Sequence, residues 1–307
     1  MNGSKSLISI IIVNYDTSKL TLECLESLRL IKTTGYDLKI IVVDNGSQEE
    51  LKIPVKLRSN DLELIRTDNN IGFTGGNNLG MSHAVKYYNP DYFLLLNSDT
   101  VVTKNFLDEL FIAIQGDDRG IAVSKILFEK GFEYHLKNYK KDELGNIIWF
   151  AGGTIDWANL TAFHRGVDEV DRGQFDQLSQ TDFATGCCML IKRDLIEKVG
   201  ILDKKYFLYL EDVDYSIRAK KKGYKIIFCP NSVIFHKNAG STGGSGSSVH
   251  EYYQTRNRIF FFLKYARLRY KLTVLKFIIK MLLKGSATQR QATLDFIIGR
   301  FGKQPLV

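Results

Sequence analysis

Short apolar runs alternate with stretches of helical periodicity over the first hundred residues. The apolar runs predict buried strands at 7–13, 38–43, 62–66 and 92–96. Apolar residues at helical spacing predict a helix over 17–30, capped by Asp16 or Thr17, and a second helix with a glycine-rich start over 72–87. Strands alternating with helices favour an α/β fold with a mostly parallel sheet, whose ligands bind outside the carboxyl ends of the strands.

The pattern is less regular from residue 131 to 180. Apolar pieces at 147–150 and 161–164, separated by glycines and charges, predict hairpins and loops. Regular elements then follow: a strand at 183–191, a helix from Arg193, a helix at 212–222 ended by Gly223, and short strands at 226–229 and 233–236. The Gly- and Ser-rich stretch 239–248 predicts a flexible loop, and we expect helices beyond it.

Charge is concentrated at the C-terminal end of the chain. After Glu251, twelve Lys and Arg residues face one acid, Asp295, which gives +11. The whole chain carries +8, so residues 1–251 carry −3. Nucleic-acid binding usually requires a basic face on the main domain, and this distribution argues against it.

Two features of the sequence predict a cytoplasmic location. The first apolar run is too short for a signal peptide, and no stretch has the roughly 20 apolar residues of a membrane span. The four cysteines include no CxxC pair, which predicts reduced thiols rather than a zinc or disulfide framework.

Polar residues directly follow two of the predicted strands. Asp44 ends the second strand and could accept a hydrogen bond from a base or a ribose hydroxyl. Asn97, Ser98 and Asp99 end the fourth strand, and Asp99 could bind Mg²⁺ or Mn²⁺ together with a diphosphate. A turn is the alternative for both motifs, because Asn-Gly and Asx residues favour turns.

A glycine-rich segment, 69–78, starts the second predicted helix. Its backbone N–H groups and the helix dipole favour an anion, and close packing against the sheet is the alternative. The spacing is not the GxGxxG fingerprint, and it follows the third strand rather than the first, which argues against a dehydrogenase. No GxSxG elbow, P-loop or HExxH motif is present in the sequence.

Three carboxylates cluster at 211–214, where a helix is expected to start. Acids there complement the helix dipole, and one of them could also act as a general base. On a helix Glu211 and Asp214 share a face, while Asp212 points elsewhere. His236 ends a short strand just before the predicted loop, where it could be a ligand or a structural residue.

The order of these motifs closely resembles the inverting family 2 glycosyltransferases, which have the GT-A fold. The resemblance covers residues 7–260 and is greatest to bacterial rhamnosyltransferases of O-antigen and other cell-surface polysaccharides. The segments that carry it are Ser9–Tyr15, Val42–Ser47, Asn69–Asn77, Leu95–Asp99, Thr185–Ile191, Glu211–Asp214 with Arg218 and Gly223, and His236.

The resemblance implies a role for each matching residue. Asp212 would be the catalytic base, supported by Glu211, and Asp99 with His236 would hold Mg²⁺ or Mn²⁺ at the DXD position. Asn97 replaces the first Asp of that motif and removes a charge. Gly186 and Cys187 would lie on the acceptor side. Donor-binding residues would be Asn14, Tyr15, Asp44, Asn69, Gly72, Gly76, Asn77, Asn97, Ser98, Arg256 and Arg258.

The same resemblance implies the reaction. A hydroxyl of a glycan or a lipid-linked glycan would attack the sugar of a nucleotide-diphosphate donor, with dTDP-L-rhamnose the preferred expectation. A UDP-hexose or UDP-N-acetylhexosamine donor is the alternative with the same fold and mechanism. A non-catalytic sugar-nucleotide or glycan binder, a nucleotidyltransferase and a dehydrogenase are less favoured.

The predicted extension over 249–307, beyond a catalytic domain at 1–248, interleaves basic and apolar residues at helical spacing. Such helices can lie on an anionic membrane surface, here the inner face of the cell membrane. The alternative is that the apolar stripe packs on the catalytic domain or on a second subunit, since amphipathic pattern alone does not distinguish the two.

Overall fold

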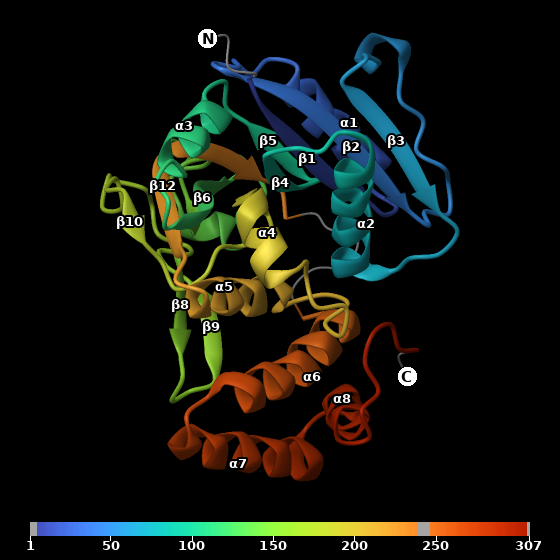
Figure 1. Ribbon diagram of the computed structural model, residues 1–307. Coiled ribbons are helices and arrows are strands. Elements are labelled where there is room, and N and C mark those ends of the chain that lie inside the picture. Colours follow the sequence, from blue (N-terminus) through green and yellow to red (C-terminus); the bar gives the residue numbers. More distant parts are fainter. Residues whose placement is uncertain (1–4, 239–245, 306–307) are drawn as a thin grey trace.

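The computed structural model describes residues 5–238 and 246–305. Its centre is a sheet in the order β10-β12-β6-β11-β4-β1-β2-β3, with β5 paired to β12 and β7 paired to β6 (Figure 1). The sheet strands are β1 (Ser6–Asn14), β2 (Tyr36–Asn45), β3 (Leu62–Thr67), β4 (Tyr92–Asn97), β5 (Thr100–Val102), β6 (Arg119–Phe128), β7 (Ile148–Phe150), β10 (Ser179–Gln180), β11 (Cys188–Lys192) and β12 (Lys225–His236). A separate hairpin joins β8 (Gly153–Asp156) and β9 (Thr161–His164).

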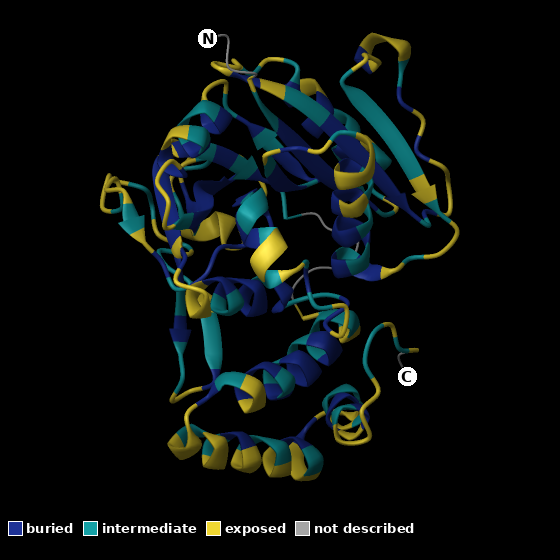
Figure 2. Cartoon of the chain, in the orientation of Figure 1, coloured by how far each residue is buried: buried dark blue, intermediate teal, exposed yellow. Residues whose placement is uncertain are grey.

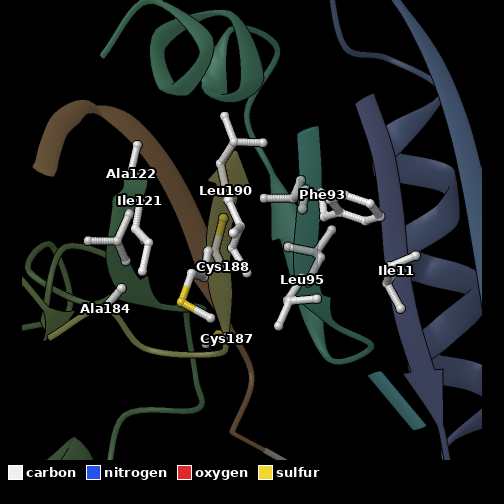
Figure 3. Packing of buried hydrophobic residues seen from close by; sticks show 14 of the residues in the cluster. Ile11, Phe93, Leu95, Ile121, Ala122, Ala184, Cys187, Cys188 and Leu190 are labelled. Atoms are coloured by element: carbon white, nitrogen blue, oxygen red, sulfur yellow. The ribbon is translucent and has the colours of Figure 1, made fainter. Parts of the chain in front are cut away.

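Strands β1 to β4 form the predicted parallel part of the sheet. Their Ile, Val and Leu runs are continuous because both faces are covered, and Ile10, Ile11 and Ile12 are fully buried. Figure 3 shows Ile11, Phe93, Leu95 and Leu190 packed across β1, β4 and β11. Parallel pairing brings the carboxyl ends of β1, β2 and β4 to one edge, where Asn14, Asp44 and Asn97 lie.

Helices cover the sheet and set the spacing of its layers. They are α1 (Ser18–Leu28), α2 (Gly72–Tyr87), α3 (Phe106–Ala113), α4 (Arg193–Val199) and α5 (Glu211–Lys221), with short 3₁₀ turns η1 (Val55–Leu57) and η2 (Leu136–Asn138). Helix α2 lies close on β1 because it presents glycines there. A Cβ atom on Gly80 would come within 2.4 Å of Ile11.

Three local expectations need correction. Residues 183–187 lie outside the strand, with a turn at Gly186 and Cys187, and β11 begins only at Cys188. The two short strands expected near residue 230 are one strand, β12, with an irregularity between Cys229 and Val233. Thr17 occupies the N-cap position of α1, but its hydroxyl bonds to Asn14 rather than to the helix backbone. The expected mostly parallel sheet is confirmed as a mixed one, in which β11 lies between β4 and β6 and is antiparallel to both.

The C-terminal residues form helices as expected: α6 (Ser248–Tyr265), α7 (Leu268–Lys284) and α8 (Ala287–Ile297). They make a layer below α5, at the end of the molecule opposite α3 (Figure 1). Ile259, Phe261 and Phe262 of α6 belong to the same buried cluster as the sheet residues, so the division at residue 248 stays a prediction. Residues 239–245 of the expected loop lie outside the described residues.

Candidate active site

A cavity of about 640 Å³ opens at the carboxyl edge of the parallel strands. Tyr15 follows β1, Asn45 ends β2, and Asn97 ends β4, so three strand ends contribute to its wall. His250, Tyr253, Gln254 and Arg258 of α6 also line it. The cavity therefore lies between the sheet edge and the C-terminal helical layer.

Asp99 and His236 meet in this cavity from two different strands. Antiparallel pairing of Thr100 with His236 brings the turn after β4 against the end of β12. The His236 Nε2 atom lies 3.1 Å from Asp99 Oδ1, and both side chains are buried. The Trp149 ring packs edge-on against His236 at 4.5 Å between centroids, which fixes the imidazole plane. His236 Nδ1 has no hydrogen-bond partner among the described residues.

The Asp99–His236 pair fits a divalent ion that is shared with a diphosphate. Mg²⁺-type ions are commonly held by one or two carboxylates, with phosphates and waters as the other ligands. Within residues 5–238 and 246–305, no group of three His, Cys, Asp or Glu side chains could hold a metal by itself. The two-ligand arrangement matches a metal that binds together with a phosphate-bearing substrate.

The segment leading into α5 has an unusual backbone. Phe207, Tyr209 and Leu210 all have φ between +60° and +69°, a left-handed region that L-residues rarely occupy. Such a conformation persists only where the surroundings hold it in place. Its hydrogen bonds therefore matter for whatever it presents to the cavity.

Helix α6 holds that segment by its carbonyl oxygens. Asn257 Nδ2 donates to the carbonyls of Tyr206, Leu208 and Tyr209 at 2.8–2.9 Å. The Arg256 guanidinium donates to the carbonyls of Lys205 and Tyr206 and, through its other nitrogen, to Gly302. These buried donors fix the backbone course of residues 205–210, which leads into α5.

Asp212 is presented to the cavity by this segment. Its carboxylate accepts hydrogen bonds from the Gly186 N–H at 2.9 Å and from the Val213 N–H at 2.8 Å. The segment 183–187, which was expected to be strand, supplies the Gly186 donor from the turn before β11. Asp212 is thus oriented by the backbone while its side chain stays half-buried at the cavity wall.

The pKa values of two adjacent carboxyl groups are displaced upward. Burial raises the pKa of Asp212, and the two backbone hydrogen bonds oppose that shift. Burial and the Asp212 charge raise the pKa of Glu211 well above its ordinary range. Glu211 Oε2 has no hydrogen-bond partner in the described part of the chain. A carboxylate with a raised pKa is a stronger base than a free one, which suits proton abstraction.

Asp214 has a structural environment instead. It is fully buried and accepts hydrogen bonds from Tyr206 at 3.1 Å and Tyr265 at 2.7 Å. Arg218 and Lys264 pair with it at 2.7 and 2.8 Å. Asp214 therefore joins α5 to α6, and it is not among the residues that line the cavity.

Most of the predicted site residues line the one cavity. They are Tyr15, Gly72, Asn97, Ser98, Asp99, Gly186, Cys187, Glu211, Asp212, His236 and Arg258. Gly72 has φ +82°, and a Cβ atom there would lie 2.5 Å from Phe207, so glycine is required where α2 meets the segment before α5.

Other predicted donor-binding residues lie behind the cavity wall. A Cβ atom on Gly76 would come within 2.8 Å of Val13, and Asn77 bonds to the Phe73 carbonyl, so both pack within the fold. Asn70, rather than the exposed Asn69, lines the cavity. The Gly-rich segment thus includes the close-packing role that the sequence left open.

Asp44 and Asn14 form a buried network at the end of β1 and β2. Asn14 Nδ2 donates to Asp44 Oδ1 at 3.0 Å, and Arg66 pairs with the other carboxylate oxygen. Burial acts to raise the pKa of Asp44, but bonds from Ser47, Leu51 and Asn14 and the Arg66 charge lower it overall. Its neighbour Asn45 lines the cavity, and the contact of Asp44 with a nucleobase stays a prediction.

Arg256 is the clearest correction among the predicted donor-binding residues. Its side chain is fully buried, and its guanidinium bonds to backbone carbonyls instead of lining the cavity. Arg258, two residues further on, does line the cavity, with its guanidinium over the Phe277 ring of α7 at 5.5 Å. Two residues along a helix differ by about 200° in direction, which explains the different surroundings.

An aromatic wall was missed by the sequence reasoning. Tyr134, Trp149 and His164 line the cavity and come from the irregular stretch 131–180. Burial lowers the pKa of His164 to about 4, so its ring is neutral at pH 7. Aromatic residues in a glycine-rich stretch without clear periodicity were the available signal.

The sequence model of glycosyl transferase family 2 matches residues 9–200, more than half of the chain. The protein belongs to this family and is a glycosyltransferase with the GT-A fold.

Two curated relatives are similar to this chain over most of its length. A low-salt glycan biosynthesis hexosyltransferase, Agl10 of Haloferax volcanii, is 26% identical over 82% of this chain and 74% of its own length. The rhamnosyltransferase WbbL of Escherichia coli K12 is 24% identical over 75% of this chain and 83% of its own.

Among solved structures, GalNAc-T7 with UDP, GalNAc and Mn²⁺ matches with a TM-score of 0.67 at 19% identity. The match covers 96% of this chain but only 55% of that one, and at this identity it shows the shared fold.

Substitutions of Arg256 and Arg258 should have different effects, the first on folding stability and the second on nucleotide binding. Arg256→Gln removes donors to buried carbonyls and should cost about 3 kcal/mol of folding stability, measured by urea unfolding. Arg258→Gln should leave stability within about 0.5 kcal/mol but weaken binding of UDP or dTDP by roughly tenfold or more in calorimetry. Equal stability loss in both variants would contradict the assignment.

Glu211 should make stability depend on pH. Its pKa is raised on folding, so its protonation contributes to folding stability. This contribution is fully present below about pH 4 and is lost as the pH rises through the raised pKa. Glu211→Gln mimics that form, so the melting temperature of the variant minus that of the wild type should grow from pH 5 to 9. Glu49→Gln, at an exposed position, is the control. A difference that does not change with pH would contradict the burial argument.

Proposed function

We propose that the enzyme transfers a sugar from a nucleotide-diphosphate donor to a hydroxyl of a glycan or lipid-linked glycan, with inversion at the anomeric carbon. The observation that carries this proposal is the position of Asp212. A backbone-oriented carboxylate with a raised pKa lines the same cavity as the Asp99–His236 pair. Within this cavity Asp212 offers a base, and Asp99 with His236 offers ligands for a phosphate-bound cation.

The reaction needs one base and no covalent nucleophile. Asp212 takes the proton of the acceptor hydroxyl while the hydroxyl oxygen bonds to the anomeric carbon. The bond from that carbon to the nucleoside diphosphate breaks on the opposite side. Burial keeps the Asp212 pKa high for this step. The Glu211 carboxyl is buried beside it, with a pKa raised by burial and by the Asp212 charge. Arg258 lines the cavity as a cation that can neutralise phosphate charge.

A divalent ion would be held by Asp99 and His236, with the remaining ligands from the donor diphosphate and water. When bound it supplies Lewis-acid stabilisation of the charge that develops on the leaving diphosphate. Asn97 lines the cavity as a neutral group in place of a second carboxylate, which lowers the charge that the protein itself offers to the ion.

For the donor we favour dTDP-L-rhamnose, and a UDP-hexose or UDP-N-acetylhexosamine is the alternative. Support for rhamnose comes from distant relatives that are named rhamnosyltransferases, WbbL among them, whereas Agl10 is named a hexosyltransferase. Asp99, His236, Glu211 and Asp212 together in one cavity disfavour a non-catalytic binder. The aromatic wall of Tyr134, Trp149 and His164 offers flat apolar faces that suit a sugar ring at the acceptor side.

Donor-dependent nucleotide release tests this proposal. The full chain with Mn²⁺ or Mg²⁺ should release dTDP from dTDP-rhamnose at a rate above that from UDP-glucose, UDP-galactose and UDP-N-acetylglucosamine. EDTA should reduce the rate by at least about a hundredfold, since a cation stabilises several kcal/mol of developing charge.

Asp99→Asn and His236→Gln should each raise the metal concentration needed for half-maximal release. Glu197→Gln, an exposed change far from the cavity wall, serves as the control. UDP release from one hexose donor would replace the donor and keep the mechanism. Direct calorimetry that finds no binding of any nucleotide sugar would overturn the proposal.

A further inference from the structure

Helix α7 carries apolar residues on two opposite faces. Its inner face packs on α6 and α8, where Val274 and Met281 are buried. Its outer face is open, and the exposed fractions of its apolar side chains are large: Leu268 82%, Leu272 65%, Leu275 53%, Ile279 47% and Leu283 73%. Figure 2 shows this exposed side of α7 along the end of the molecule. The inner face already anchors the helix, so the outer residues are not needed for the core.

The exposed residues form one continuous row, which we call the α7 stripe (Leu268, Leu272, Leu275, Ile279 and Leu283). Steps of three and four residues place them on one side of the helix. Basic side chains flank the row. At 100° per residue, Arg269, Lys276, Lys280 and Lys284 follow it on one side and Lys271 on the other.

Charge decides which partner fits the stripe. Residues 252–294 contain no acid, and the chain after Glu251 carries +11 against −3 for the rest. A second copy placed face to face on the stripe would bring two such rows of lysines together, which is unfavourable. An anionic surface that is apolar beneath its charges satisfies both the row and its flanks.

We propose that the α7 stripe lies in the plane of an anionic membrane surface, with its leucines in the acyl boundary and its lysines among the lipid headgroups. None of the described helices has the length and apolar content to cross a bilayer. The arrangement needs no conformational change, because the stripe is already exposed. This inference does not rest on the proposed reaction.

Only one helix, α6, separates α7 from the cavity. Phe277 of α7 lies under the Arg258 guanidinium at 5.5 Å, and Arg258 lines the cavity. Helix α6, which contributes His250, Tyr253 and Gln254 to the lining, packs on α7. A protein bound by the stripe would thus hold its cavity near the lipid surface.

Vesicle cosedimentation with the full chain tests the proposal. Wild type should bind vesicles of phosphatidylcholine with 30% phosphatidylglycerol and should bind pure phosphatidylcholine at least about tenfold more weakly. Raising NaCl to 0.5 M should weaken binding to the anionic vesicles, because the headgroup attraction is screened.

Two matched pairs of variants locate the contact. Leu272→Glu with Ile279→Glu should reduce binding to anionic vesicles by at least about tenfold, whereas Val55→Glu with Ile112→Glu, equally charged and also on exposed apolar positions, should bind like wild type. Lys276→Gln, Lys280→Gln and Lys284→Gln together should reduce binding by about tenfold or more, in contrast to Lys19→Gln, Lys52→Gln and Lys141→Gln.

Circular dichroism and the melting temperature check that every variant is folded, and all replaced side chains are exposed. Absence of wild-type binding to anionic vesicles would overturn the proposal. Equal loss in the stripe and control variants would do the same. Light scattering could instead find a wild-type dimer that Leu272→Glu with Ile279→Glu separates, while the wild type does not bind lipid. That result would assign the stripe to a second copy and contradict a membrane surface.

Discussion

The hydrogen bonds from Arg256 and Asn257 to the carbonyls of residues 205–209 are the constraint on which the site depends. The segment they hold contains three non-glycine residues at positive φ, a conformation that would relax without its partners. Its path determines where α5 begins at Glu211 and therefore where Asp212 lies. The C-terminal helices are thus a structural part of the cavity, because α6 both lines the cavity and supports the segment that leads to Asp212.

Two further devices complete the alignment. Asp214, buried with Arg218, Lys264 and two tyrosines, fastens α5 to α6, and the Gly186 N–H holds the Asp212 carboxylate from the opposite side. The parallel strand ends place Asn97 to Asp99 across the cavity, and β5 pairing with β12 brings His236 to them. Asp212 and the Asp99–His236 pair thus come from separate structural elements that meet at one edge of the sheet.

Much of this could be predicted from the sequence because strand ends in a parallel sheet share one edge. The four N-terminal strands and the position of the 97–99 motif at the cavity follow from apolar runs that stop at polar residues. Arg256 could not be placed, since a buried arginine on backbone carbonyls and an exposed arginine at a cavity have the same sequence pattern. Tyr134, Trp149 and His164 were missed because long-range packing positions them in a stretch without periodicity.

The central claim is that Asp212 acts as the base of the transfer, and single-turnover kinetics of Asp212→Asn test it most directly. The substitution keeps the size of the side chain and removes its basicity. We predict a rate of sugar transfer lower by about 10²–10⁴, with the dissociation constant of the nucleotide donor within about threefold of wild type. A variant that transfers sugar within about threefold of the wild-type rate would contradict the account.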